Sequence, residues 1–582
     1  MAGAAVPAGP DVELPSYAKS LFSGVIAHEL VFPFPADQDP AFDEWLEDLR
    51  RFLDAKVDAA TFDREARVPE GVIEGLAERG VFGLYVPREY DGLGLSQLRS
   101  ARAIRAVVER DASLGVVLGS HLSIGIKGIH LFGTEEQKRR WLPACARGET
   151  LASFALTEPE HGSDAAHIES RAERAEGGAW RLDGHKIWIG NAHRAGVITT
   201  FAQTPVEKDG RTVDRVTAFV VEGDDEGLEI GRTWTDEKLG IRASTQAEVF
   251  FRGVRLDDDR VLDRPGHGFK VAMHVLNGGR VALAASACGN AHTMLREAAS
   301  FAAGRRQFGR PIAEFDLVRG KLARGRLDLW VAESMVELTA SLMDRGDVDY
   351  ALESAMCKVF ASEMVWRAAD DGLQIAGGRG YMRDRPFERH LRDARIMRIF
   401  EGTNEVLRAF IALAGMERLA EYLEDVGKAL REPIKDIGVL TGFAFHRIRD
   451  AIGSRTAHVE VAAPLRGPLG QLERFTGILH ESAEKLIREH KEHLVEEQFQ
   501  LGRVADVAID SFALTAAISR AQAEIEARGE EGAAEGIDHA RQFSREAGAR
   551  IERAKAWIDD NRDERLRRIA ARAVAEAGGA AG

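Results

Sequence analysis

The stretch WRLDGHKIWI, residues 180–189, decides the fold class, because it carries a clear β pattern in a chain that otherwise shows mainly helical periodicity. Aromatic and β-branched side chains lie on both sides of an Asp-Gly pair, which is a strong signal for a tight turn between two strands. The stretch therefore predicts two short strands joined at Asp183 and Gly184.

Further β-rich segments at 197–202, 215–221 and 247–251 extend this pattern into a β domain. On either side, apolar residues recur every three or four positions, as on one face of a helix. Thr134 is placed to cap one such helix, which is expected to end at Pro143. Near the end of the chain, helices are predicted over 471–497, 500–530 and 535–576.

The fold class is therefore mainly α with a central β domain. The predicted parts are a leader or N-terminal extension (1–40), an N-terminal α domain (41–151), the middle β domain (152–265), a C-terminal α bundle (266–431) and an extra α-helical domain (432–582).

Bulk properties exclude several classes of protein. The formal net charge of -15 argues against a nucleic-acid-binding protein, because such proteins carry a basic surface. The three cysteines, Cys145, Cys288 and Cys357, form no disulfide or metal pattern, so we expect no metal and a reducing compartment. The start has no signal or transit pattern, and no apolar run of about 18 residues is visible. We expect a cytoplasmic protein.

One carboxylate stands out in RIFEGTNE, residues 398–405. Thr403 or Asn404 is explained as the cap of a helix that begins near Val406. Glu401 is not explained in this way, because it follows the apolar pair Ile399 and Phe400. An unpaired carboxylate in apolar surroundings has a raised pKa, and such a placement often marks a base.

Four other segments each allow two interpretations. In SFALTEPEHGSD (153–164), Gly-Ser-Asp is either a polar turn or part of a site. In KIWIGN (186–191), Trp188 suits a strand core as well as a ligand contact. The arginines of RRQFGRPIAEFD (305–316) are either solvated or bind phosphate. The glycines of QIAGGRGY (374–381) allow close approach to a ligand, which alone is weak evidence.

Together and in this order, the five segments resemble the acyl-CoA dehydrogenase family over about residues 40–430. FSGVIAHELVFPFP near the start, FKVAMHVLNGGR (269–280) and the helical extension are similar to the very-long-chain branch. The resemblance implies the acyl-CoA dehydrogenase-like fold and FAD as cofactor. It also implies α,β-dehydrogenation of long-chain acyl-CoA to trans-2-enoyl-CoA in fatty acid β-oxidation, with electrons passing to electron-transferring flavoprotein.

The resemblance also assigns residues. Glu401 matches the catalytic base, which removes the α proton. The segments at 305–308 and 374–378 serve the neighbouring subunit's FAD in the family, so a homodimer is expected. The FAD-binding positions are Phe154, Leu156, Thr157, Ser163, Trp188, Ile189, Arg305, Gln307, Phe308, Gln374, Gly377, Gly378, Thr403 and Glu405. The substrate-binding positions are Ser163, Asn277, Arg280, Phe400 and Gly402.

Two positions depart from the family pattern. Gly190 stands where the family usually has Thr or Ser, whose hydroxyl contacts flavin N5, so we expect a shifted flavin potential or slower hydride transfer. Asp316 stands where Gln or Gly is common, and nothing in the sequence explains it. Gly119 and Ser120 are small where shorter-chain relatives are bulkier, which fits either a deep tail tunnel or close helix packing.

Other interpretations stay open at this stage. Residues 436–450 form either an interfacial amphipathic helix, with peripheral contact at an inner membrane, or an ordinary connector. An acyl-CoA oxidase would share every motif, and a catalytically vestigial scaffold or assembly protein would share the fold.

Overall fold

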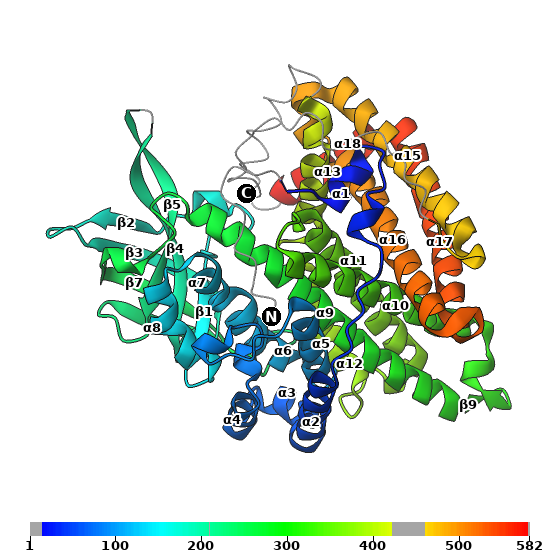
Figure 1. Cartoon of the computed structure of the whole chain (residues 1–582), viewed down its shortest axis with the longest axis horizontal. Coiled ribbons are helices and arrows are strands. Elements are labelled where there is room, and N and C mark those ends of the chain that lie inside the picture. Colours follow the sequence, from blue (N-terminus) through cyan, green and yellow to red (C-terminus); the bar gives the residue numbers. More distant parts are fainter. Residues whose placement is uncertain (1–13, 209, 422–459, 580–582) are drawn as a thin grey trace.

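The computed structural model describes residues 14–208, 210–421 and 460–579. A sheet domain lies at one side of the molecule and a large helical body at the other (Figure 1). This arrangement confirms the predicted fold class, which is mainly α with a central β domain. The predicted amphipathic segment 436–450 lies outside the described residues.

The N-terminal helices pack against both the sheet and the helical body (Figure 1). Their apolar faces form one core with the inner face of the sheet. They are α2 Pro40–Lys56, α3 Ala59–Glu65, α4 Glu70–Glu78, α5 Gln97–Val108, α6 Ala112–Leu118, a π-helical segment Gly119–Gly125, α7 Lys127–Phe132 and α8 Glu135–Ala146.

Helix α6, the π-helical segment and α7 together make one apolar stretch, Ala112–Phe132. By length and composition it could cross a membrane, a feature that inspection of the sequence missed. Of its most apolar window, 72% is buried inside the protein, as in the core helix of a globular protein.

The eight-stranded sheet has the order β6-β7-β3-β2-β4-β5-β8, and β1 pairs in parallel with β4. The long pairs are antiparallel, including β4 with β5 and β3 with β7. The strands are β1 Leu151–Ala155, β2 Arg171–Arg174, β3 Trp180–Gly190, β4 Ala195–Lys208, β5 Arg211–Glu222, β6 Leu228–Trp234, β7 Gln246–Leu256 and β8 Val261–Leu262.

The predicted turn at Asp183 and Gly184 is wrong, because β3 runs through both residues and pairs with β7. Gly184 is needed for a different reason, since a Cβ at this position would overlap the Ser170 hydroxyl. Asp183 accepts a hydrogen bond of 2.8 Å from the N–H of Gly253 beside a register shift in this pair. Close packing, rather than chain reversal, therefore explains the Asp-Gly pair.

The helical body consists of a C-terminal bundle and an extension that follows it in sequence. The bundle comprises α9 Gly268–Gly304, a hairpin of β9 Arg306–Gln307 and β10 Arg310–Pro311, α10 Asp316–Arg345, α11 Ala351–Ala376, α12 Phe387–Arg395 and α13 Asn404–Glu421. The extension comprises α15 Arg466–His490, α16 Gln498–Gly532, α17 Ala534–Asp559 and α18 Asp563–Gly579.

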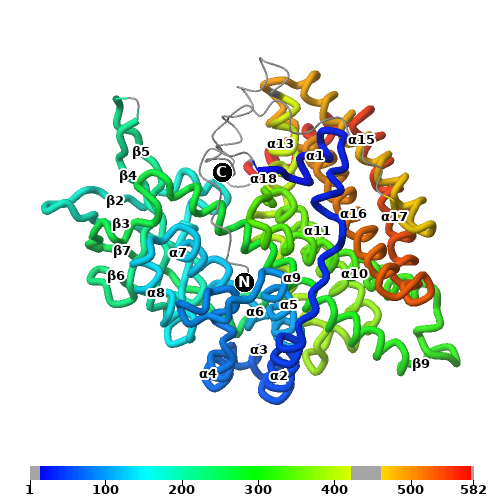
Figure 2. Tube along the Cα trace, in the orientation of Figure 1, coloured from blue at the N-terminus to red at the C-terminus, as the bar shows by residue number. Residues whose placement is uncertain are grey.

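Bundle and extension share one hydrophobic core rather than forming separate bodies. The rings of Phe360 on α11 and Phe543 on α17 lie 6.0 Å apart. The predicted extension 1–40 also joins this core through α1, Tyr17–Phe22. Figure 2 shows this N-terminal segment running along the helices of the extension and bundle as a strap.

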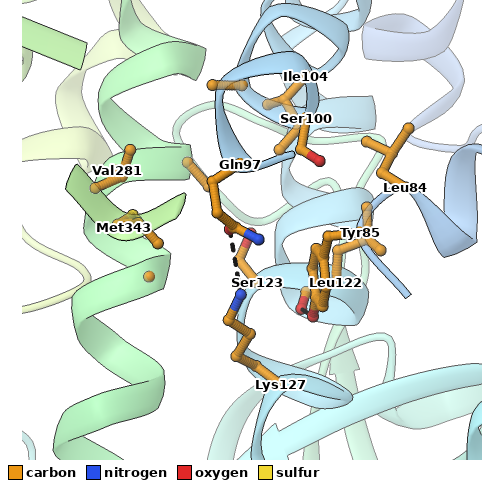
Figure 3. A pocket seen from close by; sticks show the side chains of 13 residues that line it. Leu84, Tyr85, Gln97, Ser100, Ile104, Leu122, Ser123, Lys127, Val281 and Met343 are labelled. Atoms are coloured by element: carbon orange, nitrogen blue, oxygen red, sulfur yellow. Dashed lines mark hydrogen bonds between the residues drawn. The ribbon is translucent and has the colours of Figure 1, made fainter. Parts of the chain in front are cut away.

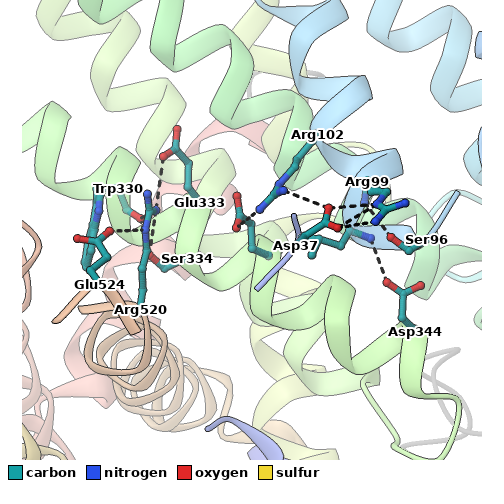
Figure 4. Close-up of polar contacts among 12 residues, drawn as sticks. Asp37, Ser96, Arg99, Arg102, Trp330, Glu333, Ser334, Asp344, Arg520 and Glu524 are labelled. Atoms are coloured by element: carbon teal, nitrogen blue, oxygen red, sulfur yellow. Dashed lines mark hydrogen bonds and ion pairs between the residues drawn. The ribbon is translucent and has the colours of Figure 1, made fainter. Parts of the chain in front are cut away.

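Polar contacts fasten the strap to α5 of the N-terminal helices and the extension to α10 of the bundle (Figure 4). Asp37 of the strap pairs with Arg99, at 2.7 Å, and with Arg102, at 3.2 Å, both on α5. Arg520 of α16 donates to the carbonyl oxygen of Trp330 on α10. These contacts link segments far apart in the sequence, so the strap is part of the folded body.

Two helix predictions were partly wrong. Thr134 caps α8 as expected, but the helix continues past Pro143 to Ala146. The charged helix predicted over 535–576 is two helices, because α17 ends at Asp559. Asp563, which begins α18, pairs with Arg503 of α16 at 2.6 Å. This tertiary contact holds the chain at the break.

Candidate active site

Glu401 lies in the short connection between a turn of 3-10 helix, Ile396–Arg398, and α13. Its φ is 58° and that of Gly402 is 89°, so both residues occupy the left-handed region. This conformation is unfavourable for a residue with a side chain, and such strain gathers at functional sites. The strain at Glu401 therefore points to a constraint on where its carboxylate lies.

The carboxylate of Glu401 lies against Gly279 of α9. A Cβ at this glycine would be 2.7 Å from Oε2 of Glu401 and 3.2 Å from Cγ2 of Ile124, so a larger residue would displace the carboxylate. Oε2 is buried and has no hydrogen-bond partner among the described residues. Burial raises the pKa of Glu401 to about 7, against the opposing charges of Arg280 and Lys358. A free carboxylate oxygen with this pKa is suited to accept a proton.

Arg280 and Asn277 stand beside this carboxylate on α9. The Nε of Arg280 donates to the backbone oxygen of Glu401 at 3.4 Å, and its Nη1 donates to Asn277 Oδ1 at 2.8 Å. Arg280 is buried, and burial lowers its pKa to about 10 although the charge of Glu401 opposes the shift. The structure thus brings together both predicted substrate residues of α9 and the predicted base.

Lys358 of α11 holds the other side of the Glu401 turn. Its side chain is fully buried, and Nζ donates to the backbone oxygen of Gly402 at 2.7 Å and to Asn404 Oδ1 at 2.8 Å. Asn404 donates in turn to Ser362 and Glu363, so it does not cap the helix. Thr403 fills that role, because its hydroxyl accepts from the N–H of Val406 at 3.3 Å.

The predicted FAD-binding residues on the sheet divide by exposure. Phe154, Leu156 and Ile189 are buried. Trp188, with a φ of 60°, leaves 60% of its surface exposed, and Ser163 is exposed. An indole held open in a strained conformation is available to stack on a planar ligand.

An ion pair missed in the sequence fixes the backbone at this edge of the sheet. Lys186 and Glu158 are both buried and pair at 2.7 Å, and Lys186 also donates to the Leu156 carbonyl. Glu158 accepts from the backbone N–H of Ser170 at 2.9 Å. Both residues occur within the quoted motifs, beside predicted site residues. Their burial and their pairing are visible only in the structure.

The remaining predicted FAD-binding residues lie away from the sheet. Gln307 and Phe308 belong to the β9–β10 hairpin, which projects from the end of the helical body opposite the sheet, and Arg305 directly precedes it (Figure 1). Phe308 is 93% exposed. Gln374 lies at the end of α11, and a Cβ at Gly377 or Gly378 would meet nothing within 4 Å. One chain alone therefore does not bring the hairpin to the sheet.

Comparison with known proteins shows which family the chain belongs to. Models of the N-terminal, middle and C-terminal domains of acyl-CoA dehydrogenase match residues 40–149, 153–254 and 266–416. The chain belongs to the acyl-CoA dehydrogenase family. Its extension matches the model described as ACAD9/ACADV, C-terminal domain, over residues 466–579.

Individual relatives agree with this assignment. A mitochondrial very long-chain specific acyl-CoA dehydrogenase of Bos taurus is 42% identical over 520 residues, covering 87% of this chain and 78% of that protein. A probable acyl-CoA dehydrogenase of Mycobacterium tuberculosis is 34% identical over 92% of this chain and 85% of its own. An acyl-CoA dehydrogenase of Bacillus anthracis, solved in complex with FAD, has a TM-score of 0.77 at 28% identity and covers 95% of this chain and 92% of that chain.

Gly190, which stands where this family usually has Thr or Ser, lies against a side chain from another element. A Cβ at Gly190 would overlap Oγ of Ser120, which therefore occupies the space that a side chain at 190 would take. Close packing against β3 therefore limits the size of the side chain at Ser120. At Gly119 there is no such limit, because a Cβ there would meet nothing within 4 Å. Close packing explains the small residue at 120 and does not explain the one at 119.

Inspection of the sequence assigned no role to Gly279 or Lys358, and it pointed to Ser120 only as a small residue for tail length or helix packing. A lysine in the apolar run MCKVF of α11 was a usable signal for Lys358, since lysine is rarely buried without a partner. No local pattern shows that Gly279 leaves room for Glu401 or that Ser120 packs beside Gly190, because these contacts join different elements.

Proposed function

We propose that this chain catalyses FAD-dependent α,β-dehydrogenation of long-chain acyl-CoA to trans-2-enoyl-CoA in fatty acid β-oxidation. The observation that carries the proposal is Glu401, whose buried Oε2 is unpaired and whose pKa is raised to about 7. A very long-chain specific relative at 42% identity supports the substrate class. Electron-transferring flavoprotein is the proposed electron acceptor.

The residues at the exposed edge of the sheet and just after the base fit FAD. The exposed indole of Trp188 offers an aromatic face to a planar ring, and the side chain of Thr157 is half-buried at the same edge of the sheet. Thr403 and Glu405 follow the base directly, and Glu405 is exposed. When bound, FAD supplies the acceptor for the hydride that leaves the β carbon.

The protein's own contribution is to place and tune the base. Glu401 Oε2 takes the α proton, and its pKa near 7 leaves a large share of the carboxylate ionised at neutral pH. In the described part of the chain the backbone N–H of Glu401 has no hydrogen-bond acceptor, so it is free to donate to the thioester oxygen. Lys358 and Arg280 bind the backbone oxygens of Gly402 and Glu401 and keep this turn in place.

The test is anaerobic bleaching of the flavin band near 450 nm with a series of acyl-CoA lengths, on wild type and Glu401→Gln. We expect long chains to bleach only the wild type. A yellow protein that no acyl-CoA bleaches would show that the substrate class is wrong. A colourless protein that cannot be reconstituted would favour a scaffold, and hydrogen peroxide formed in air would favour an oxidase.

A homodimer is part of this proposal. The predicted FAD-binding residues of the hairpin lie far from the sheet of the same chain, so a second copy is needed to complete each site (Figure 1). Phe308 and Leu317, at 93% and 88% exposure, leave an apolar surface there that a second copy would cover. Light scattering on the purified protein tests this, and a monomer that binds FAD fully would contradict it.

Cytoplasmic location with peripheral contact at the inner membrane is also a proposal. Helix α18 supports it, because Leu566, Ile569 and Val574 are exposed beside several arginines. An apolar face flanked by arginine suits an anionic lipid surface. Co-sedimentation of the whole protein with anionic and neutral vesicles tests the contact, and equal recovery in the supernatant with both would refute it.

A further inference from the structure

A small cavity with one polar wall lies beside α9 (Figure 3). It has a volume of about 30 Å³ and lies between α5, the 119–127 segment, α9 and α10. Its polar wall is formed by Gln97, Ser100, Ser123 and Lys127, and the rest is apolar. We call these four residues and the space they enclose the polar recess.

Lys127 has few partners for a buried cation. It is 5% exposed, and its Nζ donates to Gln97 Oε1 at 3.2 Å and lies 3.9 Å from the centre of the Tyr85 ring. Within the described residues no carboxylate lies within 4.0 Å of Nζ. An ammonium group carries three donors, so one hydrogen bond leaves it short of acceptors.

Ser100 adds a second unused group. Its side chain is 4% exposed, and its Oγ is buried with no hydrogen-bond partner among the described residues. Burial lowers the pKa of Lys127 to about 8, although the charge of Asp344 opposes this shift. The carboxylate of Asp344 instead accepts from the backbone N–H groups of Gln97 and Leu98. The recess therefore offers a positive charge and hydrogen-bond donors, and apart from Gln97 Oε1 no acceptor among the described residues pairs with them.

Two neighbouring glycines of α9 relate the position of the recess to that of the base, since one lies beside each. A Cβ at Gly279 would lie 2.7 Å from Glu401 Oε2, and a Cβ at Gly278 would lie 3.5 Å from Cε of Lys127. Adding these contacts to standard backbone dimensions places Lys127 Cε at most about 13 Å from the carboxylate of Glu401. An extended chain advances about 1.2 Å per bond, so no more than about ten or eleven bonds from the reacting carbons are needed to reach the recess.

We propose that the polar recess binds a carboxylate at the far end of an acyl chain, so that the enzyme also dehydrogenates CoA thioesters of dicarboxylic acids with about twelve carbons. The inference rests on the proposed dehydrogenation and adds a substrate class to it. A carboxylate accepts several hydrogen bonds, which matches the unused donors of Lys127 and Ser100. The reaction itself is unchanged: the α proton goes to Glu401 and the β hydride to bound FAD.

The test compares dodecanoyl-CoA with dodecanedioyl mono-CoA by anaerobic flavin bleaching and by kcat/KM in a dye-coupled assay. In wild type, we expect kcat/KM for the two substrates to agree within about tenfold. The reason is that hydrogen bonds from the recess offset the cost of burying the terminal carboxylate of the dicarboxylic chain. Lys127→Met should lower the ratio of dicarboxylic to plain substrate about 10- to 100-fold, because it removes a charged hydrogen-bond donor. Lys127→Arg keeps the charge and should retain most of the ratio.

Two further variants keep the test decisive. Ser100→Ala removes only one hydroxyl and should lower the ratio about 2- to 10-fold, which also serves if Lys127→Met folds poorly. Lys138→Met removes a lysine of α8 that pairs with Glu135 at the surface, and it should leave the ratio unchanged. A wild type that bleaches with dodecanoyl-CoA but discriminates more than about 1,000-fold against the dicarboxylic chain would overturn the inference.

An unchanged ratio in both Lys127→Met and Ser100→Ala would also overturn it and would indicate that the recess holds only water, which its volume permits. If neither substrate bleaches the wild type, the proposed dehydrogenation itself fails, which is a distinguishable outcome.

Discussion

Replacing Lys358 by Met tests whether this buried lysine positions and tunes the base. The lysine donates to the oxygens of Gly402 and Asn404 on either side of Thr403, just after Glu401. Its charge lowers the pKa of Glu401, which burial raises to about 7. Methionine has a similar length, and it removes both the donors and the charge.

The variant should remain folded, because two effects of similar size oppose each other. Burial lowers the pKa of Lys358 to about 7 from 10.5, and a shift of this size corresponds to about 5 kcal/mol of unfavourable free energy. The two hydrogen bonds from a charged group contribute roughly 3 to 6 kcal/mol in the opposite direction. A charged donor is therefore exchanged for an apolar side chain with a small net change in stability.

The expected change is in the acidity of Glu401. Loss of the positive charge raises the pKa of Glu401 further above its usual value, so less carboxylate is present at neutral pH. If the pKa rises by about one unit, the ionised share at pH 7 falls from about one half to about one tenth, and bleaching slows about fivefold. Raising the pH should recover the rate, since the carboxylate is the active form.

The assay is the single-turnover rate of anaerobic bleaching by a long-chain acyl-CoA between pH 6 and pH 9. The charged groups that face Lys358 are Arg280 on α9, Glu363 on α11, and Glu401 and Glu405. Lys358→Arg keeps the charge and should restore the lower midpoint, and Lys485→Met on α15 is a matched surface control. A pH profile for Lys358→Met with the wild-type midpoint would refute the reasoning on acidity.

Three other perturbations have defined outcomes. Gly190→Thr should weaken FAD retention because its Cβ overlaps Ser120, and adding Ser120→Ala should restore retention measured by flavin absorbance; equal retention in both variants would contradict this. Phe543→Ala, in the core that the extension shares with the bundle, should cost roughly 3 to 5 kcal/mol and lower one cooperative melting transition. Two separate transitions would show that the extension folds independently. Burial raises the pKa of Glu353 to about 7 in the folded state, so its stability contribution is complete below pH 4.5 and falls as pH rises toward 7, by about 3 kcal/mol. Glu353→Gln should therefore unfold at higher urea than wild type at pH 8 and at similar urea near pH 4.5, and equal midpoints at pH 8 would exclude this linkage.

Features that depend on neighbouring residues in the chain could be predicted from the sequence. A β-rich composition identified β4, β5 and β7, and helical periodicity identified helices on both sides of the sheet. Glu401 was singled out because a carboxylate beside Phe400 before a helix cap has no structural explanation. Whether Glu401 is the base stays a proposal that the bleaching experiment tests.

Predictions failed where a residue's role depends on a distant neighbour. The Asp-Gly pair of β3 has the composition of a turn, but the space at Gly184 is taken by Ser170 from outside the strand. The contact of Gly190 with Ser120 was likewise not visible in the sequence, and the expected effect of Gly190 on the flavin stays a prediction. Local propensity cannot express such contacts, because they exist only after the elements have packed.

The sequence by itself determined the order of α and β parts, the family motifs and the position of the carboxylate, because these depend on local patterning and composition. The tertiary structure decided what surrounds that carboxylate: Gly279 gives it room, Lys358 and Arg280 bind its turn, and burial raises its pKa. It also decided that the strap and the extension share the bundle's core. Burial and electrostatic interaction depend on residues brought together from across the chain, which is why only the folded molecule defines them.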